Sequence, residues 1–297
     1  MSIAGCLEFL AEKREFILTL SFFVGFFGAA LAETLHPFRR AGYEFGARWG
    51  VNVTLVLGNW MAVAWLVPEP AGVAAQLRLT ALEAVAIWLR EHPIIGTLTS
   101  VLLIDMARYW VHRLSHGVSW LWRLHAVHHS DTDLDATTGF RHHPFEYLLV
   151  SAIMTLFYIL IGVPVAALVI YGMLAASIAP FTHANTKLPD WLEHALNKIF
   201  VTNQFHALHH SVDMREGNSN FGIVFSIWDR LFATRIDPSA DRFASIRFGV
   251  EGVSSAAAAS LRQVLIHPFR HQALVDPTPG AASAIGTQRG GHPLGSD

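Results

Sequence analysis

The chain has 297 residues, of which 52% are hydrophobic and 15% charged, with a formal net charge of −2 at pH 7 and a mean hydropathy of +0.37. Proteins that bind nucleic acids carry a basic surface, so this charge argues against a nucleic-acid partner. The single cysteine, Cys6, excludes an internal disulfide and a metal site built from several thiolates. Long, nearly uncharged runs of residues instead identify an integral membrane protein.

Five segments are apolar enough to enter a membrane, where a full crossing needs about 20 mostly apolar residues. In chain order they are Phe16–Leu35, Val51–Val67, Pro93–Val111, Tyr147–Ile161 and Val165–Phe181. We therefore expect an all-α integral membrane helical bundle of about four to five hydrophobic segments, with a cytoplasmic histidine-rich helical cap. The tail from Asp276 onward is rich in Gly, Pro, Ala and Ser, and we expect it to be disordered.

The last two segments are separated only by Gly162-Val163-Pro164, which favours a tight turn. They would form a hairpin that enters and leaves the membrane on the same side, so that histidines before and after it share one face. Because Lys and Arg are enriched in cytoplasmic loops, the arginines after the first segment indicate that this face is cytoplasmic, in the inner membrane of a bacterium. These arginines are Arg39, Arg40 and Arg48.

Histidines are concentrated in the middle third of the chain, where 12 of the 17 lie between residues 112 and 210. Eight of them form one HxxxH and two HxxHH clusters. Residues three or four apart lie on one side of an α-helix within about 6 Å of each other, so we expect each cluster to face one centre. One metal takes about four to six ligands, and eight imidazoles therefore predict two metals close together. The clusters are His112/His116, His125/His128/His129 and His206/His209/His210.

The residue types around the clusters narrow the choice of metal. A zinc peptidase places glutamate directly after the first histidine of HExxH, whereas Arg113 follows His112 here and the other clusters also lack that glutamate. Structural zinc sites are closed by four ligands and commonly use cysteine. Neutral nitrogens with few carboxylates suit a redox metal such as iron, and they leave the metal charge uncompensated. Such a centre favours the strong oxidant that an unactivated C–H bond requires.

The first cluster lies within Asp105-x3-Tyr109-Trp110-x-His112-Arg113-x2-His116. Shorter motifs accompany the later clusters: Arg141-His142-His143-Pro144-Phe145-Glu146, His183-Ala184-Asn185, Asn220-Phe221-Gly222 and Trp228-Asp229-Arg230-Leu231-Phe232-Ala233-Thr234. In this order they resemble the fatty acid hydroxylase/sterol desaturase superfamily over roughly residues 97–235, with Ala233 where glycine is usual. Members are membrane-embedded, histidine-ligated di-iron enzymes that use O₂ to hydroxylate or desaturate lipids.

The resemblance implies that the eight clustered histidines bind two iron ions, which zinc can replace during purification. His183, at the mouth of the hairpin, is a ninth candidate ligand, with a hydrogen-bonded interface histidine as the alternative. His143 is either a tenth ligand or a structural partner of Glu146. His142 is expected to be exposed.

Two polar residues are candidates for supporting the ligands. Asp105 lies seven residues before His112 on the same helical face, so it could accept a hydrogen bond from Nδ1 of that imidazole. An ion pair of Asp105 with Arg108 or Arg113 is the alternative. Asn185 is a candidate for holding a ligand or a water molecule.

We expect an oxygenase that uses O₂ and external electrons to hydroxylate or desaturate a fatty acyl, sterol or isoprenoid lipid. The chain has no flavin or nicotinamide fingerprint and too few cysteines for an iron–sulfur cluster, so a separate ferredoxin or cytochrome b5-like protein with its reductase is expected to supply the electrons. The alternative is a membrane metal transporter or metal-binding protein, which would favour ligands within the spans. The expected regions are a membrane anchor (1–92), a catalytic domain (93–235), a C-terminal cytoplasmic segment (236–275) and a tail (276–297).

Overall fold

The computed structural model describes residues 3–40, 45–67, 82–237 and 239–270, so the predicted disordered tail lies outside the described residues. Five described helices are long and apolar enough to cross a membrane. They are α2 (Arg14–Leu35), α3 (Phe45–Leu66), α6 (Pro93–Gly117), α8 (Pro144–Ile161) and α9 (Val165–His183). Within the described ranges, β pairing is limited to three isolated bridges. The chain is a multi-pass membrane protein, and the all-α prediction is confirmed.

Two of these helices extend beyond the apolar segments that predicted them. The third segment was expected to end at Val111, whereas α6 continues to Gly117 and carries His112 and His116. Hydropathy falls where the polar residues begin, but the backbone hydrogen bonds of the helix continue past that point. His112 and His116 are buried, so they face the protein interior. Helix α3 likewise begins at Phe45, before its apolar stretch.

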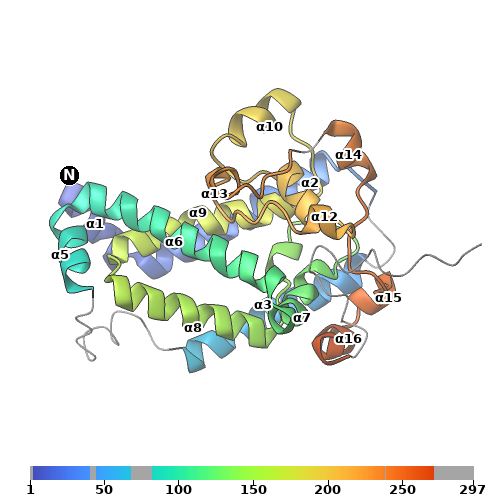
Figure 1. Ribbon diagram of the computed structural model, residues 1–297, viewed down its shortest axis with the longest axis horizontal. Helices are drawn as coiled ribbons and strands as arrows, with labels where there is room; N and C mark the ends of the chain where they lie inside the picture. Colours follow the sequence, from blue (N-terminus) through green and yellow to red (C-terminus); the bar gives the residue numbers. More distant parts are fainter. Residues whose placement is uncertain (1–2, 41–44, 68–81, 238, 271–297) are drawn as a thin grey trace, which may run out of the picture.

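Helices α1 (Ile3–Glu12) and α5 (Glu83–Glu91) lie at one end of the bundle, and α7 (Ser119–His129) lies at the other (Figure 1). The end that carries α7 is covered by short elements that follow α7 in the chain, which together form the cap. These are the 3-10 helices η1 (Thr138–Phe140) and η2 (His267–Phe269) with α10 (Asp190–Leu196), α11 (Asn203–His209), α12 (Met214–Gly217), α13 (Ile227–Leu231), α14 (Ala240–Ser245), α15 (Ser255–Ala258) and α16 (Leu261–Ile266).

The outer faces of the long helices are apolar and exposed. Phe23 and Phe27 of α2 project outward, and Trp65 near the end of α3 is 89% exposed. In water such a belt would be an aggregation-prone patch, whereas lipid acyl chains cover it in a membrane.

The inner faces pack closely. Helix α2 runs along α9, and a Cβ atom at Gly25 would lie 2.5 Å from the carbonyl oxygen of Ala176, so the two backbones approach as only glycine allows. A buried apolar core joins α6, α8 and α9 to the segment before α13. Its fully buried members are Val101, Ile104, Met154, Ala167, Tyr171 and Val224.

The α8–α9 connection is the tight turn that the sequence predicts. Gly162 ends α8 with a φ of 68°, in the left-handed region, and its N–H lies within hydrogen-bond distance of the carbonyls of Tyr158 and Ile159. Figure 1 shows the two helices diverging from this turn, and α6 contacts both of them. Pro144, at the start of α8, and His183, at the end of α9, consequently lie at the same end of the bundle, beside α7.

Candidate metal centre

Nine of the ten histidines predicted as ligands come together where α6, α7, α9 and α11 meet. They form two groups, and within each group one ring nitrogen of every histidine lies within 4.8 Å of the others. The first group is His112, His116, His125, His129 and His209, and the second group is His128, His183, His206 and His210. All nine side chains are buried.

Each HxxHH triplet is divided between the two groups, so the prediction that a triplet faces one centre is wrong. In α7, His125 and His129 belong to the first group and His128 to the second. In α11 the arrangement is reversed, because the i, i+4 pair joins the second group and His209 joins the first. Side chains rotate by about 100° per residue along a helix, so positions i+3 and i+4 lie on opposite sides of position i. Two adjacent histidines therefore serve two different centres.

Hydrogen bonds at Nδ1 fix the tautomers of three rings in the first group. Nδ1 of His112 lies 2.9 Å from the carbonyl oxygen of Phe221, and Nδ1 of His209 lies 2.7 Å from that of Ser219. Nδ1 of His125 lies 2.6 Å from a carboxylate oxygen. All three oxygens act as acceptors, so Nδ1 of each ring carries a proton, and in the neutral form of the ring Nε2 carries a lone pair.

The lone pairs of the first group point at one another. Nε2 of His112 lies 2.9 Å from Nε2 of His209 and 3.1 Å from Nε2 of His125. With no proton between them, these contacts are repulsive unless a cation lies among the nitrogens. Nε2 of His116 and Nε2 of His129 are also buried, without a hydrogen-bond partner in the described part of the chain. Five imidazole nitrogens around one point form a donor set suited to a transition-metal ion.

The second group converges on Nε2 of His183. Its Nδ1 lies 2.8 Å from the carbonyl oxygen of Ala179, so its Nε2 carries the lone pair. That Nε2 lies 3.1 Å from Nε2 of His206, 3.2 Å from Nε2 of His210 and 3.4 Å from Nε2 of His128. Four converging nitrogens fit a second ion.

The protein surroundings favour the neutral form of the five grouped rings that lie in α7 and at α11, outside the membrane-spanning helices. Burial, followed by the charges of neighbouring histidines, holds the pKa of His128, His206 and His210 well below its ordinary value. The pKa values of His129 and His209 are lowered for the same reasons. A metal ion binds the neutral imidazole, so the site keeps its donors in the binding form.

A carboxylate supports both groups from the membrane side. Glu146, in the first turn of α8, accepts a hydrogen bond from Nδ1 of His125 at 2.6 Å, and its second oxygen lies 3.3 Å from Nδ1 of His142. The His142 ring stacks on that of His128 with centroids 4.6 Å apart. The prediction that His142 is exposed is wrong, because its side chain is only 25% exposed. Sequence reasoning had considered Glu146 only as a partner of His143.

His143 reaches neither group. Its Nδ1 accepts a hydrogen bond from the backbone N–H of Phe145 at 3.2 Å and so caps α8, while its Nε2 lies 3.2 Å from the carbonyl oxygen of Leu265. The capping position turns the ring toward the C-terminal segment and away from α7. His143 thus bonds neither a histidine group nor Glu146, the two partners that the sequence predicted for it.

Asp105 does not bind Nδ1 of His112 as predicted, because the Phe221 carbonyl takes that position. The Asp105 carboxylate instead accepts four hydrogen bonds, three of them from the loop at 221–228, and it lies outside ion-pair distance of Arg108 and Arg113. The donors are Tyr171 Oη (3.0 Å), Val224 N (3.1 Å), Phe225 N (3.1 Å) and Trp228 Nε1 (2.7 Å). Asp105 thus acts on His112 through this loop rather than directly.

The same loop is fixed from its other side by Asp229, to which sequence reasoning assigned no role. Oδ1 of Asp229 accepts from the backbone N–H of Phe221 at 2.7 Å, and Oδ2 accepts from that of Gly222 at 2.8 Å. The available signal was its position in the Trp228-Asp229 motif. Two buried aspartates therefore hold the carbonyl that orients His112.

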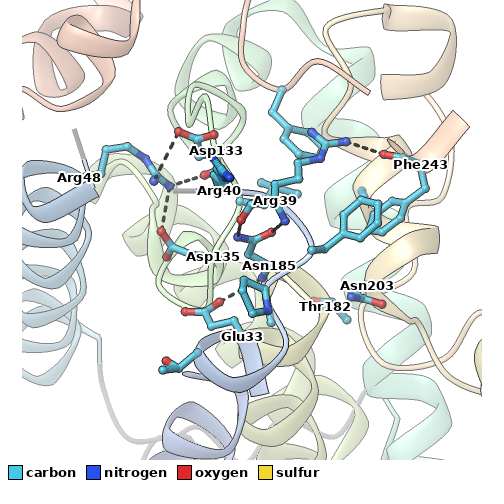
Figure 2. A pocket seen from close by; sticks show the side chains of 17 residues that line it. Glu33, Arg39, Arg40, Arg48, Asp133, Asp135, Thr182, Asn185, Asn203 and Phe243 are labelled. Atoms are coloured by element: carbon cyan, nitrogen blue, oxygen red, sulfur yellow. Dashed lines mark hydrogen bonds and ion pairs between the residues drawn. The ribbon is translucent and has the colours of Figure 1, made fainter. Parts of the chain in front are cut away.

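Asn185 lies in a polar cavity of about 480 Å³ and binds the segment after α2 (Figure 2). Its backbone N–H donates to Glu33 at 3.1 Å. Its side chain accepts a hydrogen bond from the backbone N–H of Arg39 at 3.0 Å and donates one to the Arg39 carbonyl oxygen at 2.7 Å. Two hydrogen bonds therefore join the Asn185 side chain to the Arg39 backbone. The Asn185 amide bonds Arg39 and no histidine of either group, so it does not support a ligand directly, and its predicted role in holding a water molecule stays a prediction.

A second cavity, of about 180 Å³, reaches both histidine groups from between the membrane helices. Its apolar lining includes Val111 of α6, Val150 of α8 and Ile223 of the segment before α13. The histidines that line it are His112 and His125 of the first group and His128, His183 and His206 of the second. An apolar chain lying between α6, α8 and α9 would therefore meet both groups at once.

Residues 97–234 match the family model described as fatty acid hydroxylase. These residues belong to that family. The fatty acid hydroxylase domain spans α6 to α13 and so contains every histidine of both groups.

The chain is also similar to proteins named as hydroxylases and as a monooxygenase. The chain is 34% identical to the ornithine lipid hydroxylase OlsE of Rhizobium tropici over 57% of its own length and 49% of that protein. It is 30% identical to a cholesterol 25-hydroxylase-like protein of Danio rerio over 45% of its length and 53% of that protein. It is 28% identical to the alkylglycerol monooxygenase of Danio rerio over 47% and 30%. The chain thus spans about half or less of these relatives, and no solved structure matches it.

Proposed function

We propose that this protein is a di-iron lipid hydroxylase that uses O₂ and electrons from a separate protein. Its nine grouped histidines would hold the two irons, five around one ion and four around the other. When bound, the irons would supply O₂ activation and an oxidant able to take hydrogen from a C–H bond. The observation that carries this proposal is the convergence of buried imidazole Nε2 atoms in two adjacent groups.

The chain's own residues would hold these donors in place. Phe221 and Ser219 carbonyls keep the protons of His112 and His209 on Nδ1, which leaves Nε2 free to bind. Glu146 does the same for His125, and among the described residues it is the one carboxylate that hydrogen-bonds a ring of either histidine group. Such partners orient the ring and raise its basicity as a ligand.

Lipid is the expected substrate because the cavity beside the histidines lies between membrane helices. An acyl, sterol or isoprenoid chain entering there would be shielded from water by the walls of α6, α8 and α9. The relatives favour hydroxylation over desaturation, since those named are hydroxylases and a monooxygenase. In this reaction O₂ takes two electrons from the substrate C–H bond and two from the donor, and it leaves one oxygen atom in the product and one in water.

A ferredoxin or a cytochrome b5-like protein with its reductase would deliver the two external electrons. The histidine end of the bundle would face the cytoplasm, where such donors and their reductants are found. The basic segment after α2 supports this orientation, because Arg39 and Arg40 lie at that same end.

A metal transporter is the competing function, because His112, His116 and His183 lie within the last turns of helices that can span the membrane. The absence of any ladder of ligands along these helices disfavours it, since in the described residues every group of three or more metal-binding side chains lies at one end of the bundle. A bound metal that exchanges freely, with no O₂ consumed when lipid and reductant are added, would favour transport instead.

Metal analysis after anaerobic reconstitution with iron tests the proposal. We expect two irons per chain, and about one in each of the double variants His125→Ala/His129→Ala and His206→Ala/His210→Ala, which remove the i, i+4 pair of one group each. Both variants should lose O₂-dependent lipid oxidation. His194→Ala is the matched control, since that ring is exposed and bonds only within α10. One iron per chain in a fully active wild-type protein would refute the two-metal centre.

A further inference from the structure

Arg108 presents a positive charge inside the membrane bundle. It lies on α6 one turn before His112, within a helix that can span the membrane, and it lines the cavity that reaches both histidine groups. Residues four apart on a helix are neighbours, about 6 Å apart on the same face. Arg108 therefore lines the same cavity as the histidines of both groups.

The two buried arginines in the described part of the chain, Arg48 and Arg141, each have several partners. Arg48 is paired with Asp131 and Asp135, and its guanidinium also donates to a backbone carbonyl. Arg141 donates to the Asn52 side chain at 2.9 Å as well as to Ser130 and two backbone carbonyls. In the described part of the chain, Arg108 has no ion pair and no hydrogen bond. Its five N–H donors thus have no acceptor from the described chain.

No neighbouring group in the described chain supplies the missing acceptor. Asp105, one turn earlier on α6, is the carboxylate whose charge acts on Arg108, yet it is occupied by its four donors. The other groups that act on Arg108 electrostatically are the phenols of Tyr147, Tyr158 and Tyr171. A charged side chain within a membrane span is expensive and is retained for a functional partner. The remaining space beside it is the cavity itself.

We infer that Arg108 binds a carbonyl-type oxygen of the lipid substrate, either a carboxylate or an amide or ester carbonyl. This inference rests on the proposed function and deepens it, because it says which part of the lipid enters the cavity. A guanidinium matches such oxygens with two parallel N–H donors. With the oxygen held there, the C–H bond presented to the histidine groups lies only a few bonds from the carbonyl carbon, and not far along an acyl chain.

The inference is tested by binding, which does not require oxygenase activity. Purified protein in detergent is titrated with radiolabelled palmitate by scintillation proximity, and N-methylpalmitamide and hexadecane are added as competitors. Wild type is compared with Arg108→Met, which keeps the apolar stem, and with Arg108→Lys, which keeps the charge. Arg113→Met is the matched control, because that guanidinium lies over the Trp110 ring and outside the cavity.

We expect Arg108→Met to weaken palmitate binding roughly 10- to 100-fold, the equilibrium factor for losing a hydrogen bond to a charged group. Arg108→Lys should recover part of the affinity, and Arg113→Met should match wild type. If N-methylpalmitamide also depends on Arg108, the site takes carbonyls in general; if palmitate alone does, it takes carboxylates. Hexadecane should compete equally well in all variants.

Equal palmitate affinity in wild type and Arg108→Met would overturn the inference, as would an equal loss for hexadecane. Thermal unfolding of each variant shows whether a loss of binding reflects a loss of fold. If the binding result holds but no lipid is oxidised by the iron-loaded protein, the proposed function fails while the oxygen-binding role of Arg108 stands.

Discussion

The Asp105→Asn substitution tests how the site is held from a distance. In the native chain one carboxylate accepts four hydrogen bonds, at 2.7 to 3.1 Å, from α9 and from the 221–228 loop. Asparagine has the same shape, but its NH₂ group would face two N–H donors that then have no acceptor. Each buried donor left unsatisfied costs about 1–3 kcal/mol, so the substitution should cost about 2–6 kcal/mol.

The lost hydrogen bonds should also disturb the metal site, because the loop that Asp105 holds contacts His112. Asp105 fixes Val224 and Phe225, and the same loop carries the Phe221 carbonyl that keeps the Nδ1 proton of His112 in place. We therefore expect Asp105→Asn to lower the unfolding temperature in detergent and to weaken metal retention in the first group. Thermal unfolding and the iron content after dialysis against a chelator measure the two effects.

Tyr171→Phe is the matched control for this experiment. It removes one donor, at 3.0 Å, and leaves Asp105 with three, so it should cost only about 1–2 kcal/mol and leave the iron content unchanged. Asp105→Asn with wild-type stability and wild-type iron retention would show that the loop is held by other contacts, and the argument would be wrong.

Three further predictions concern the fold and its orientation. The first uses single cysteines in a background without the native cysteine. A cysteine in place of Glu251 should react with an impermeant thiol reagent from the histidine side of the membrane, and one in place of Glu12 only from the opposite side. Reaction of both from one side would contradict the arrangement of spans. Arg48→Met should destabilise the protein by about 3–5 kcal/mol near neutral pH, because it leaves buried carboxylates unpaired. Burial raises the pKa of Asp131, but the Arg48 charge and hydrogen bond outweigh it and hold that pKa below its ordinary value. The native pair therefore contributes stability above the ordinary aspartate pKa of about 3.9, and this contribution is lost as pH falls. In denaturant unfolding, the difference in free energy of unfolding between variant and wild type should shrink below about pH 4. A difference that does not depend on pH would refute the pairing. Gly162→Ala should lower the free energy of unfolding by about 2 kcal/mol or more. The φ of Gly162 is 68°, and the added Cβ would lie 2.3 Å from a side-chain carbon of α5. An unchanged unfolding temperature would contradict the strained turn.

The sequence alone determined those features that depend on short stretches of chain. Hydropathy over about 20 residues located all five membrane helices, since crossing a bilayer is a requirement of composition and length. The short Gly162 turn and the even number of crossings placed the histidines at one end. Spacing of three and four residues singled out the eight clustered histidines, because such positions lie on neighbouring faces of a helix.

Only the tertiary structure decided how those histidines are shared. Whether His128 and His129 face the same centre depends on the rotation of α7 relative to α6, α9 and α11, and spacing within one helix carries no information on that. The partner of Asp105 was missed for a related reason, since its acceptor oxygens are filled by donors from residues 119 to 123 positions later in the chain. His143 had the right residue type and the right motif, yet capping α8 turned its ring away. Long-range packing fixes such choices, because each buried polar atom takes whichever partner the assembled helices bring to it.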